Sequence, residues 1–183
     1  MSNSDPQNPK KNPNPVKRYE VTALVSDAPG PWDAAIGTAF FDVINRDSVP
    51  QNSFTGGQNI PNKGYPIEMI PIGDKIWRGY FYRDALQDED YFKLGICHWD
   101  VTSVGVGFAA QSIHFKAGSM LDDFLKNGPQ TTYFKKKSYG DDKFKGDSAP
   151  GNSAPDYSSD DPEVTQHLDE YFSITVIVKE VAP

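Results

Sequence analysis

Apolar residues in this chain follow a period of two, and that pattern constrains the fold more than any other feature. In the first apolar segment, Tyr19, Val21, Ala23 and Val25 alternate with other residues, most of them polar. Such alternation is typical of a β-strand with one buried and one exposed face. Aromatic residues favour pleated sheet surfaces and make up 13% of the sequence, which also indicates strands.

The same pattern predicts a series of short strands along the chain. After the strand at 19–25, we expect strands at 36–44, 65–72, 75–82, 95–102, 104–110, 112–115, 130–137 and 171–181. Gly73-Asp74 is a suitable hairpin turn between two of them. A parallel α/β sheet would need a helix after almost every strand, so many short strands with frequent turns favour an all-β fold, an antiparallel β-sandwich.

Only two short helices are expected. Ser119 and Asp122 resemble a capping box at the start of a helix over 120–126, and Asn127-Gly128-Pro129 would end it. Pro162 suits the first position of a second helix, which would lead to Leu168. Neither helix is long enough to organise the fold.

Two segments lack the composition of a packed core. Residues 2–16 contain four Pro, four Asn and one aliphatic residue, which predicts a disordered linker over 1–16. Residues 137–161 are rich in Gly, Ser, Pro and Asp, which predicts a mobile loop. At 183 residues the chain has room for one core, so we expect a single β-sandwich domain over 17–183.

Charge and cysteine content exclude several classes of function. The net charge of −7 and the absence of a basic stripe disfavour binding to nucleic acid. Cys97 is the only cysteine, so the chain can form no internal disulfide and no thiolate cluster. No apolar run is long enough to span a bilayer. We expect no metal and no cofactor.

Few residue patterns point to catalysis. The glycines of 105–110 superficially fit a dinucleotide fingerprint, but a strand rather than a long helix is expected to follow. His98 and Asp100 would share one face of a strand, where they could hold a metal or a proton, and His114 could join them. Nucleophile-elbow, zinc-protease and Walker motifs are absent from the sequence. We therefore expect binding rather than an enzyme.

Acidic loops that also carry aromatic residues are the best candidates for a contact surface. Their carboxylates could instead cap helices or collect calcium, although none of the loops matches an EF-hand. Tyrosine provides anchoring area in protein interfaces, while carboxylates steer a basic partner. We expect loops at one end of the sandwich to bind a partner, with candidate contacts at Asp88, Glu89, Asp90, Tyr91, Asp141, Asp142 and Tyr157.

The residues between Trp77 and Trp99 carry a family resemblance. Trp77-x-Gly79-x-Phe81 is followed by Asp90-Tyr91-Phe92-x-x-Gly95-x-Cys97-x-Trp99. This block resembles a pattern of small bacterial lipoproteins, including immunity proteins encoded beside secreted antibacterial effectors. The resemblance implies a protein that occludes the active site of a toxin. It also implies that the toxin is a type VI secretion effector, such as a phospholipase.

A lipoprotein would also explain the polar N-terminus. A tail of Ser, Asn and Pro is what remains when a signal peptide and a lipid-bearing Cys are removed, so Met1 could stand where that Cys was. The expected location is then the periplasm, with an outer-membrane anchor as one option and that anchor as the only membrane contact. An ordinary cytosolic N-terminus or a tag remnant would have the same composition.

Two other functions compete with toxin binding. A carbohydrate- or envelope-binding β-sandwich would stack exposed aromatic rings on sugars, and Trp32 would be the first residue to test. A small hydrolase would use loop carboxylates or the His98 and Asp100 pair. Solvent exposure separates the three, because sugar binding needs an aromatic trough, an enzyme needs convergent polar groups, and protein binding needs a projecting loop.

Overall fold

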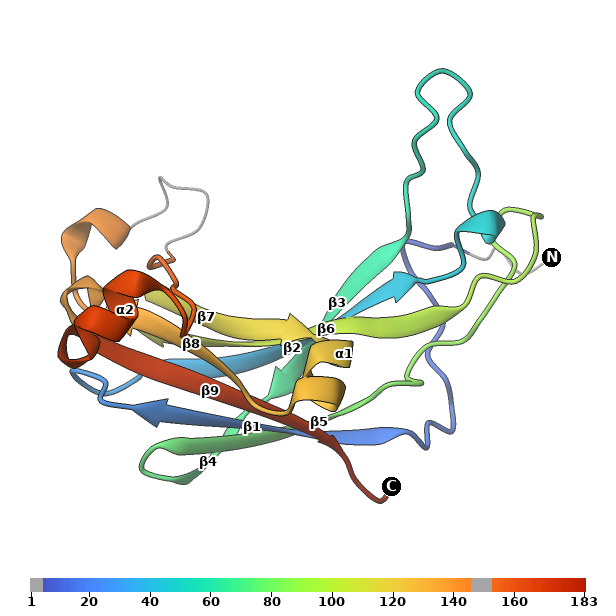
Figure 1. The fold of residues 1–183 in the computed structure, drawn as a ribbon. Helices are drawn as coiled ribbons and strands as arrows, with labels where there is room; N and C mark the ends of the chain where they lie inside the picture. Colours follow the sequence, from blue (N-terminus) through green and yellow to red (C-terminus); the bar gives the residue numbers. More distant parts are fainter. Residues whose placement is uncertain (1–4, 146–152) are drawn as a thin grey trace.

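Two antiparallel sheets pack face to face in the computed structural model, which describes residues 5–145 and 153–183 (Figure 1). One sheet has the strand order β4-β5-β1-β9-β8 and the other the order β3-β2-β6-β7. This confirms the predicted β-sandwich. The strands are β1 (Arg18–Ser26), β2 (Ala34–Val43), β3 (Asn62–Glu68), β4 (Ile70–Gly73), β5 (Ile76–Tyr82), β6 (Trp99–Ala110), β7 (Ile113–Met120), β8 (Gln130–Lys135) and β9 (Tyr171–Glu180).

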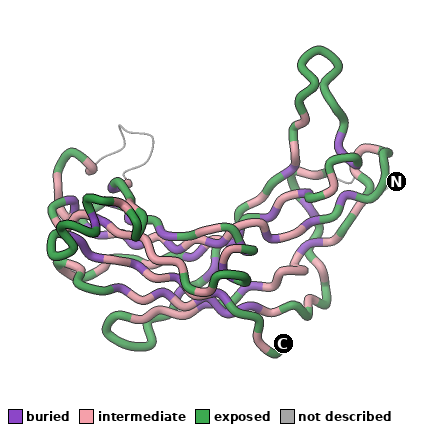
Figure 2. Tube along the Cα trace, in the orientation of Figure 1, coloured by how far each residue is buried: buried purple, intermediate pink, exposed green. Residues whose placement is uncertain are grey.

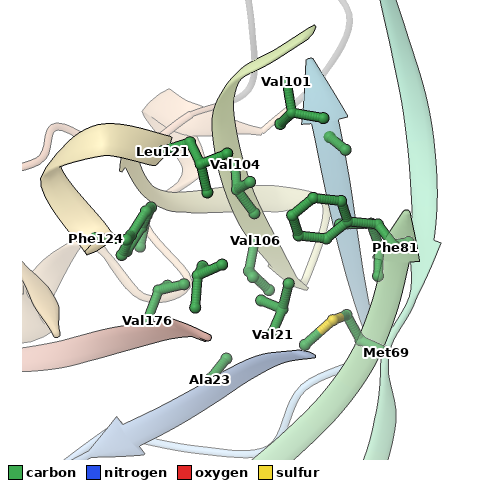
Figure 3. Packing of buried hydrophobic residues seen from close by; sticks show 14 of the residues in the cluster. Val21, Ala23, Met69, Phe81, Val101, Val104, Val106, Leu121, Phe124 and Val176 are labelled. Carbon is green, nitrogen blue, oxygen red and sulfur yellow. The ribbon is translucent and has the colours of Figure 1, made fainter. Parts of the chain in front are cut away.

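The core lies between the sheets and is built by the period-two pattern. Val21 of β1 and Val176 of β9 point inward from the five-stranded sheet towards Val104 and Val106 of β6 (Figure 3). All four side chains are buried. The helix α1 (Leu121–Asn127) joins β7 to β8, the edge strands of the two sheets. Its Leu121 and Phe124, also buried, fill the core on that side.

Two of the expected strands are joined in the structure. The strands expected at 95–102 and 104–110 are one strand, β6, which begins only at Trp99. The pairing of β2 with β6 shifts between Phe40 and Phe41, which leaves Thr102 as the bulged residue. Thr102 and Ser103 are therefore adjacent residues that are both only partly buried. The sequence alternation breaks at this bulge, although the strand continues through it.

The strand expected at 65–72 is also divided, because its two halves belong to different sheets. Residues up to Glu68 form β3, residues from Ile70 form β4, and the chain crosses from one sheet to the other at Met69. Gly79 of β5 lies against this crossing. A Cβ atom on Gly79 would stand 2.5 Å from the backbone oxygen of Glu68, so the crossing requires glycine at this position.

Both expected helices are present, but only the second one starts as predicted. α1 is capped by Met120 without a side-chain hydrogen bond, so the predicted capping box is wrong. Ser119 still belongs to β7, and its hydroxyl bonds the carboxylate of Asp123 at 3.0 Å. The second helix, α2 (Pro162–Gln166), begins as predicted, with Pro162 in the first turn and Asp161 accepting a hydrogen bond from the Glu163 amide.

The described part of the N-terminal segment, which composition predicts to be a disordered linker, is hydrogen-bonded to the domain. Asn12 donates to the backbone of Ala85, and Gln87 donates to the backbone of Lys10, both at 2.8 Å. The side chain of Asp84 accepts hydrogen bonds from the amides of residues 16 and 17. Residues 84–87 thus fix this segment, and its composition alone gave no sign of that.

Residues 137–161 are expected to form a mobile loop. The structure describes its first part, 137–145, and its second part, 153–161, while 146–152 lie outside the described residues. Its first part contains two short 3-10 turns, Lys136–Ser138 and Asp142–Phe144. Its second part contacts both sheets, because Ala154 donates to the backbone of His114 and Tyr157 pairs with Tyr133 of β8.

Candidate functional site

The candidate contact residues lie at opposite ends of the sandwich. Asp88 to Tyr91 belong to the loop 83–98, which immediately precedes the start of β6 at Trp99. Asp141 and Asp142 follow Tyr139, whose ring packs on Trp32 beside Phe108, near the other end of β6. The ten residues from Trp99 to Phe108 span roughly 30 Å in a strand. The two groups therefore cannot form the single contact surface that the sequence suggested (Figure 1).

The end that carries Asp88 also carries the most prominent projection of the molecule, the loop 44–61 between β2 and β3. This loop rises away from the sandwich and is exposed along most of its length (Figure 2). Phe54, at the turn of the loop, is 98% exposed. A ring with almost no contact to its own chain keeps nearly all of its apolar surface available to a partner.

Hydrogen bonds order the turn that presents Phe54. The Asn52 side chain accepts from the amides of Phe54 at 2.9 Å and of Thr55 at 3.1 Å. The Asn52 backbone exchanges hydrogen bonds with Gly56 and Gly57, both at 2.8 Å. Gly56 has a φ of 69°, a left-handed conformation that favours glycine. These hydrogen bonds fix the backbone of the turn, so the exposed ring of Phe54 is attached to an ordered segment.

The loops 44–61 and 83–98 are joined at their bases. Asn45 donates from its side-chain amide to the Ile96 backbone at 2.8 Å and accepts from the His98 amide at 2.7 Å. Cys97 is fully buried and points its thiol at the backbone oxygen of Ser48. The two loops form one unit, which we call the loop end, defined as residues 44–61 and 83–98.

The acidic residues of the loop 83–98 have structural partners. Asp88 contacts the His98 ring nitrogen Nδ1 at 2.7 Å and accepts from the Trp99 amide at 2.9 Å. Asp90 accepts from the Lys93 amide at 2.7 Å. Glu89 pairs with Lys10 at 2.5 Å. These contacts shape the loop 83–98, and they leave Asp88 and Asp90 exposed to solvent.

Tyr91 lies at the base of the loop 83–98 and, like the acidic residues, has partners within the chain. Its hydroxyl accepts a hydrogen bond from the indole nitrogen of Trp99 at 3.0 Å, and its ring packs edge-on to the rings of Trp99 and Phe92. Burial raises the pKa of Tyr91 above its ordinary value. The phenol therefore stays neutral, and Tyr91 supports the loop from below.

The outer surface of the loop end combines carboxylates with apolar side chains. Asp47, Asp88 and Asp90 are exposed there. Among the apolar side chains, each of the following is more than half exposed: Ile44, Phe54, Leu94 and Ile96. An apolar group with a polar, charged rim is a common arrangement in protein contact surfaces.

The sequence pattern did not identify the loop 44–61 as part of a candidate site. Its Asn, Ser, Thr and Gly residues have the composition of an ordinary turn, and a single Phe gives no periodic signal. One cue was available, because Phe54 has no apolar residue within four positions on either side except Pro50. A large apolar residue in such a context has no local partner to pack against.

The expected pairing of His98 with Asp100 is wrong. His98 precedes β6 and contacts Asp88 instead. Asp100 binds Arg83 through two hydrogen bonds of 2.6 and 2.7 Å, and this pair raises the pKa of Arg83. His114 is exposed on β7, in the other half of the sandwich. Within residues 5–145 and 153–183, no three His, Cys, Asp or Glu side chains are grouped to hold a metal ion.

At the opposite end, the candidate residues are engaged in local structure. Asp141 accepts a hydrogen bond from the Lys143 amide, which lowers the pKa of Asp141, and Asp142 pairs with Lys145 at 2.8 Å. The ring of Tyr157 packs edge-on to Tyr171 and lies 5.2 Å from the ammonium of Lys135. These contacts order the described parts of the segment 137–161 and join Tyr157 to β8 and β9.

Trp32, the candidate for sugar stacking, belongs to an aromatic cluster. Its ring centroid lies 5.2 to 5.9 Å from those of Phe108, Phe115, Tyr139 and Phe172. The indole is only partly exposed. Its position therefore does not favour a sugar-binding trough.

Comparisons with protein-family models, curated proteins and solved structures give no match. Among the described residues, no helix is both long enough and apolar enough to cross a bilayer.

Proposed function

We propose that this chain is an immunity protein that binds a secreted antibacterial toxin through the loop end and occludes the toxin's active site. The observation that carries the proposal is the fully exposed ring of Phe54 on an ordered, projecting turn. A projection of this shape suits insertion into a concave site, which is where the catalytic groups of most enzymes lie.

A single aromatic anchor can contribute a large part of the binding free energy of such a contact. Burying a Phe side chain contributes about 1.5–3 kcal/mol, and interface hot spots are commonly aromatic groups that fill a pocket. The Asn52 hydrogen bonds fix the turn before binding, so less conformational entropy is lost on association. Ile44, Leu94 and Ile96 lie on the same loop end outside this turn, and they would add apolar contact area beyond the anchor.

The charge of the loop end supports a basic partner surface. Asp47, Asp88 and Asp90 are exposed on the loop end, and the whole chain has a net charge of −7. Carboxylates at the rim of an interface mainly accelerate association and exclude partners of the wrong charge. The mouth of an enzyme that acts on phosphate-containing lipids would offer the complementary charge.

The resemblance of the Trp77–Trp99 block to lipoprotein immunity proteins agrees with this proposal. It supports the periplasm as the location, with a lipid anchor as the only membrane contact, and a type VI secretion effector such as a phospholipase as the partner. The block includes the loop 83–98 and the first residue of β6, and its buried Cys97 and Trp99 hold the loop end in place. The residues that carry the resemblance therefore help to determine the shape of the proposed contact surface.

A growth assay tests this function. The chain would be directed to the periplasm of a susceptible bacterium together with the effector encoded by the neighbouring gene. We expect wild-type chain to restore growth, F54A to lose most of the protection, and L168A to retain it. Leu168 is the matched control, because it is 57% exposed and lies near the opposite end of the sandwich, just before β9. No protection by wild type, or full protection by F54A, would contradict the proposal.

A further inference from the structure

The outward face of the four-stranded sheet is a second exposed apolar surface, separate from the loop end. Ile36 and Phe40 of β2 and Met120 of β7 are 57%, 46% and 53% exposed. Glycines of β6 lie beside them and form the floor of a shallow groove of about 370 Å³. We call this surface the open face. Its central residues are the outward-pointing members of β3, β2, β6 and β7.

Strand register arranges the centre of the open face in three rows of four residues. Each row takes one residue from β3, β2, β6 and β7 in that order, as the pairings give them. The first row is Glu68, Ile36, Gly107 and Lys116. The second row is Pro66, Thr38, Gly105 and Gly118, and the third is Gly64, Phe40, Ser103 and Met120.

We propose that a second copy of this chain covers the open face. The two copies would be related by a two-fold axis that runs parallel to the strands, between β2 and β6. Stacked sheets normally pack with their strands nearly aligned, which this axis provides. Closed two-fold dimers are also the commonest symmetric assembly of soluble proteins.

This axis places large side chains opposite small ones in each row. Rotation exchanges the β2 position with the β6 position, and the β3 position with the β7 position, at the same level along the strands. Ile36 then faces Gly107 of the second copy, and Phe40 faces Ser103. Thr38 faces Gly105, Pro66 faces Gly118, and Met120 faces Gly64.

The same rotation pairs the two charges of the first row. Glu68 and Lys116 lie at opposite edges of the open face, and both are exposed. Neither forms an ion pair with another residue in the described parts of the chain. In the proposed dimer, Glu68 of each copy faces Lys116 of the other. One surface therefore carries both halves of two identical ion pairs.

The other in-plane two-fold axis, perpendicular to the strands, lacks this complementarity. It exchanges the first and third rows, so Ile36 would face Phe40 and Gly107 would face Ser103. Large side chains would then oppose large ones, while gaps would remain between small ones. Glu68 and Lys116 would face Gly64 and Met120 instead of each other. The register therefore favours the axis along the strands.

Gly107 gives a further reason to expect a close approach at this face. A Cβ atom at Gly107 would lie 3.8 Å from its nearest neighbour, so the fold of one chain leaves room for a larger residue. Glycine in the middle of a strand weakens the strand and often marks a place where another backbone comes close. Gly118 differs, because its Cβ would stand 2.5 Å from the Val104 oxygen, so the sheet itself requires glycine there.

Analytical ultracentrifugation of the full chain tests the dimer through Gly107. We expect wild type to sediment with twice the mass of one chain, and G107V to dissociate at least roughly tenfold more readily. G73V is the matched control, since Gly73 ends β4 in the other sheet with open space around it. It should remain a dimer. A monomeric wild type, or a G107V protein that associates as wild type does, would overturn the proposal.

Charge exchange tests the same geometry without altering the backbone. E68K and K116E alone should each be monomeric, because each replaces two ion pairs with two repulsive contacts. A mixture of the two variants should form a heterodimer, since E68K supplies both cations and K116E both anions. The mixture would still decide the question if G107V failed to fold. If both single variants stayed dimeric, or if the mixture stayed monomeric, the axis would be wrong.

Discussion

Replacing Asp84 with alanine should release the N-terminal segment from the domain. The Asp84 carboxylate accepts hydrogen bonds from the Val16 amide at 3.0 and 3.2 Å and from the Lys17 amide at 2.9 Å. These contacts, together with the backbone pairing of Lys10 and Asn12, join the segment to residues 84–87. Without the carboxylate, two of the amides that hold the segment lose their acceptor.

The magnitude follows from the number and kind of these bonds. A hydrogen bond to a charged group contributes about 1.5–3 kcal/mol, but released amides at an exposed site can bond to water. We therefore take the lower end of the range and expect about 2 kcal/mol for opening of the segment, which is roughly a 30-fold increase in the open population. Global stability should change less, since few buried side chains depend on this segment.

Amide hydrogen exchange measures this opening directly. In D84A, the amides of Val16, Lys17 and Asn12 should exchange faster by about the predicted 30-fold, while amides in β1 keep their protection. D90N is the matched control, because Asp90 also accepts a backbone amide, that of Lys93, but lies outside the contact with the N-terminal segment. Unchanged exchange at Val16 and Lys17 in D84A would refute the assignment of Asp84 as the anchor.

Three further predictions concern stability. Phe115 is fully buried and packs on Trp32, so F115A should lose about 3–5 kcal/mol in urea unfolding; a loss below about 1 kcal/mol would contradict the described core. D100A should lose about 1–2 kcal/mol by the same measurement, because Arg83 loses both hydrogen bonds of a partly exposed pair, and an unchanged midpoint would argue against that pair. Burial opposes ionisation of Asp84, but the backbone hydrogen bonds outweigh it and lower its pKa, so its stabilisation is complete above about pH 4 and is lost as the pH falls through the folded value. The stability difference between wild type and D84N should therefore shrink from neutral pH to about pH 2, and a constant difference would show that the carboxylate charge is not responsible.

The alternation of apolar residues was sufficient to predict the class of fold, because it depends on burial along each strand. The exceptions share a physical cause. At Thr102 a bulge interrupts the alternation without ending β6, and at Met69 the chain changes sheets without a turn residue. Both features depend on the partner strand, so a single sequence carries little signal for them.

The candidate site was less predictable. Carboxylates and tyrosines identified the loop 83–98, yet the structure gives most of them internal partners such as His98 and Lys93. The same composition also selected Asp141 and Asp142, at the far end of the sandwich. Composition cannot separate two ends of one domain, since the distance between them depends on strand order. Phe54 was missed because its exposure is a property of the projecting loop 44–61.

Affinity for the toxin, measured by titration calorimetry with purified proteins, tests the central claim most directly. The toxin would be the effector encoded by the neighbouring gene, titrated with wild type, F54A and L168A. We predict tight binding by wild type, weakening of about 30-fold for F54A from the loss of about 2 kcal/mol of aromatic burial, and no change for L168A. Absence of binding by wild type, or equal affinities for wild type and F54A, would contradict the account of the loop end as the toxin-binding surface.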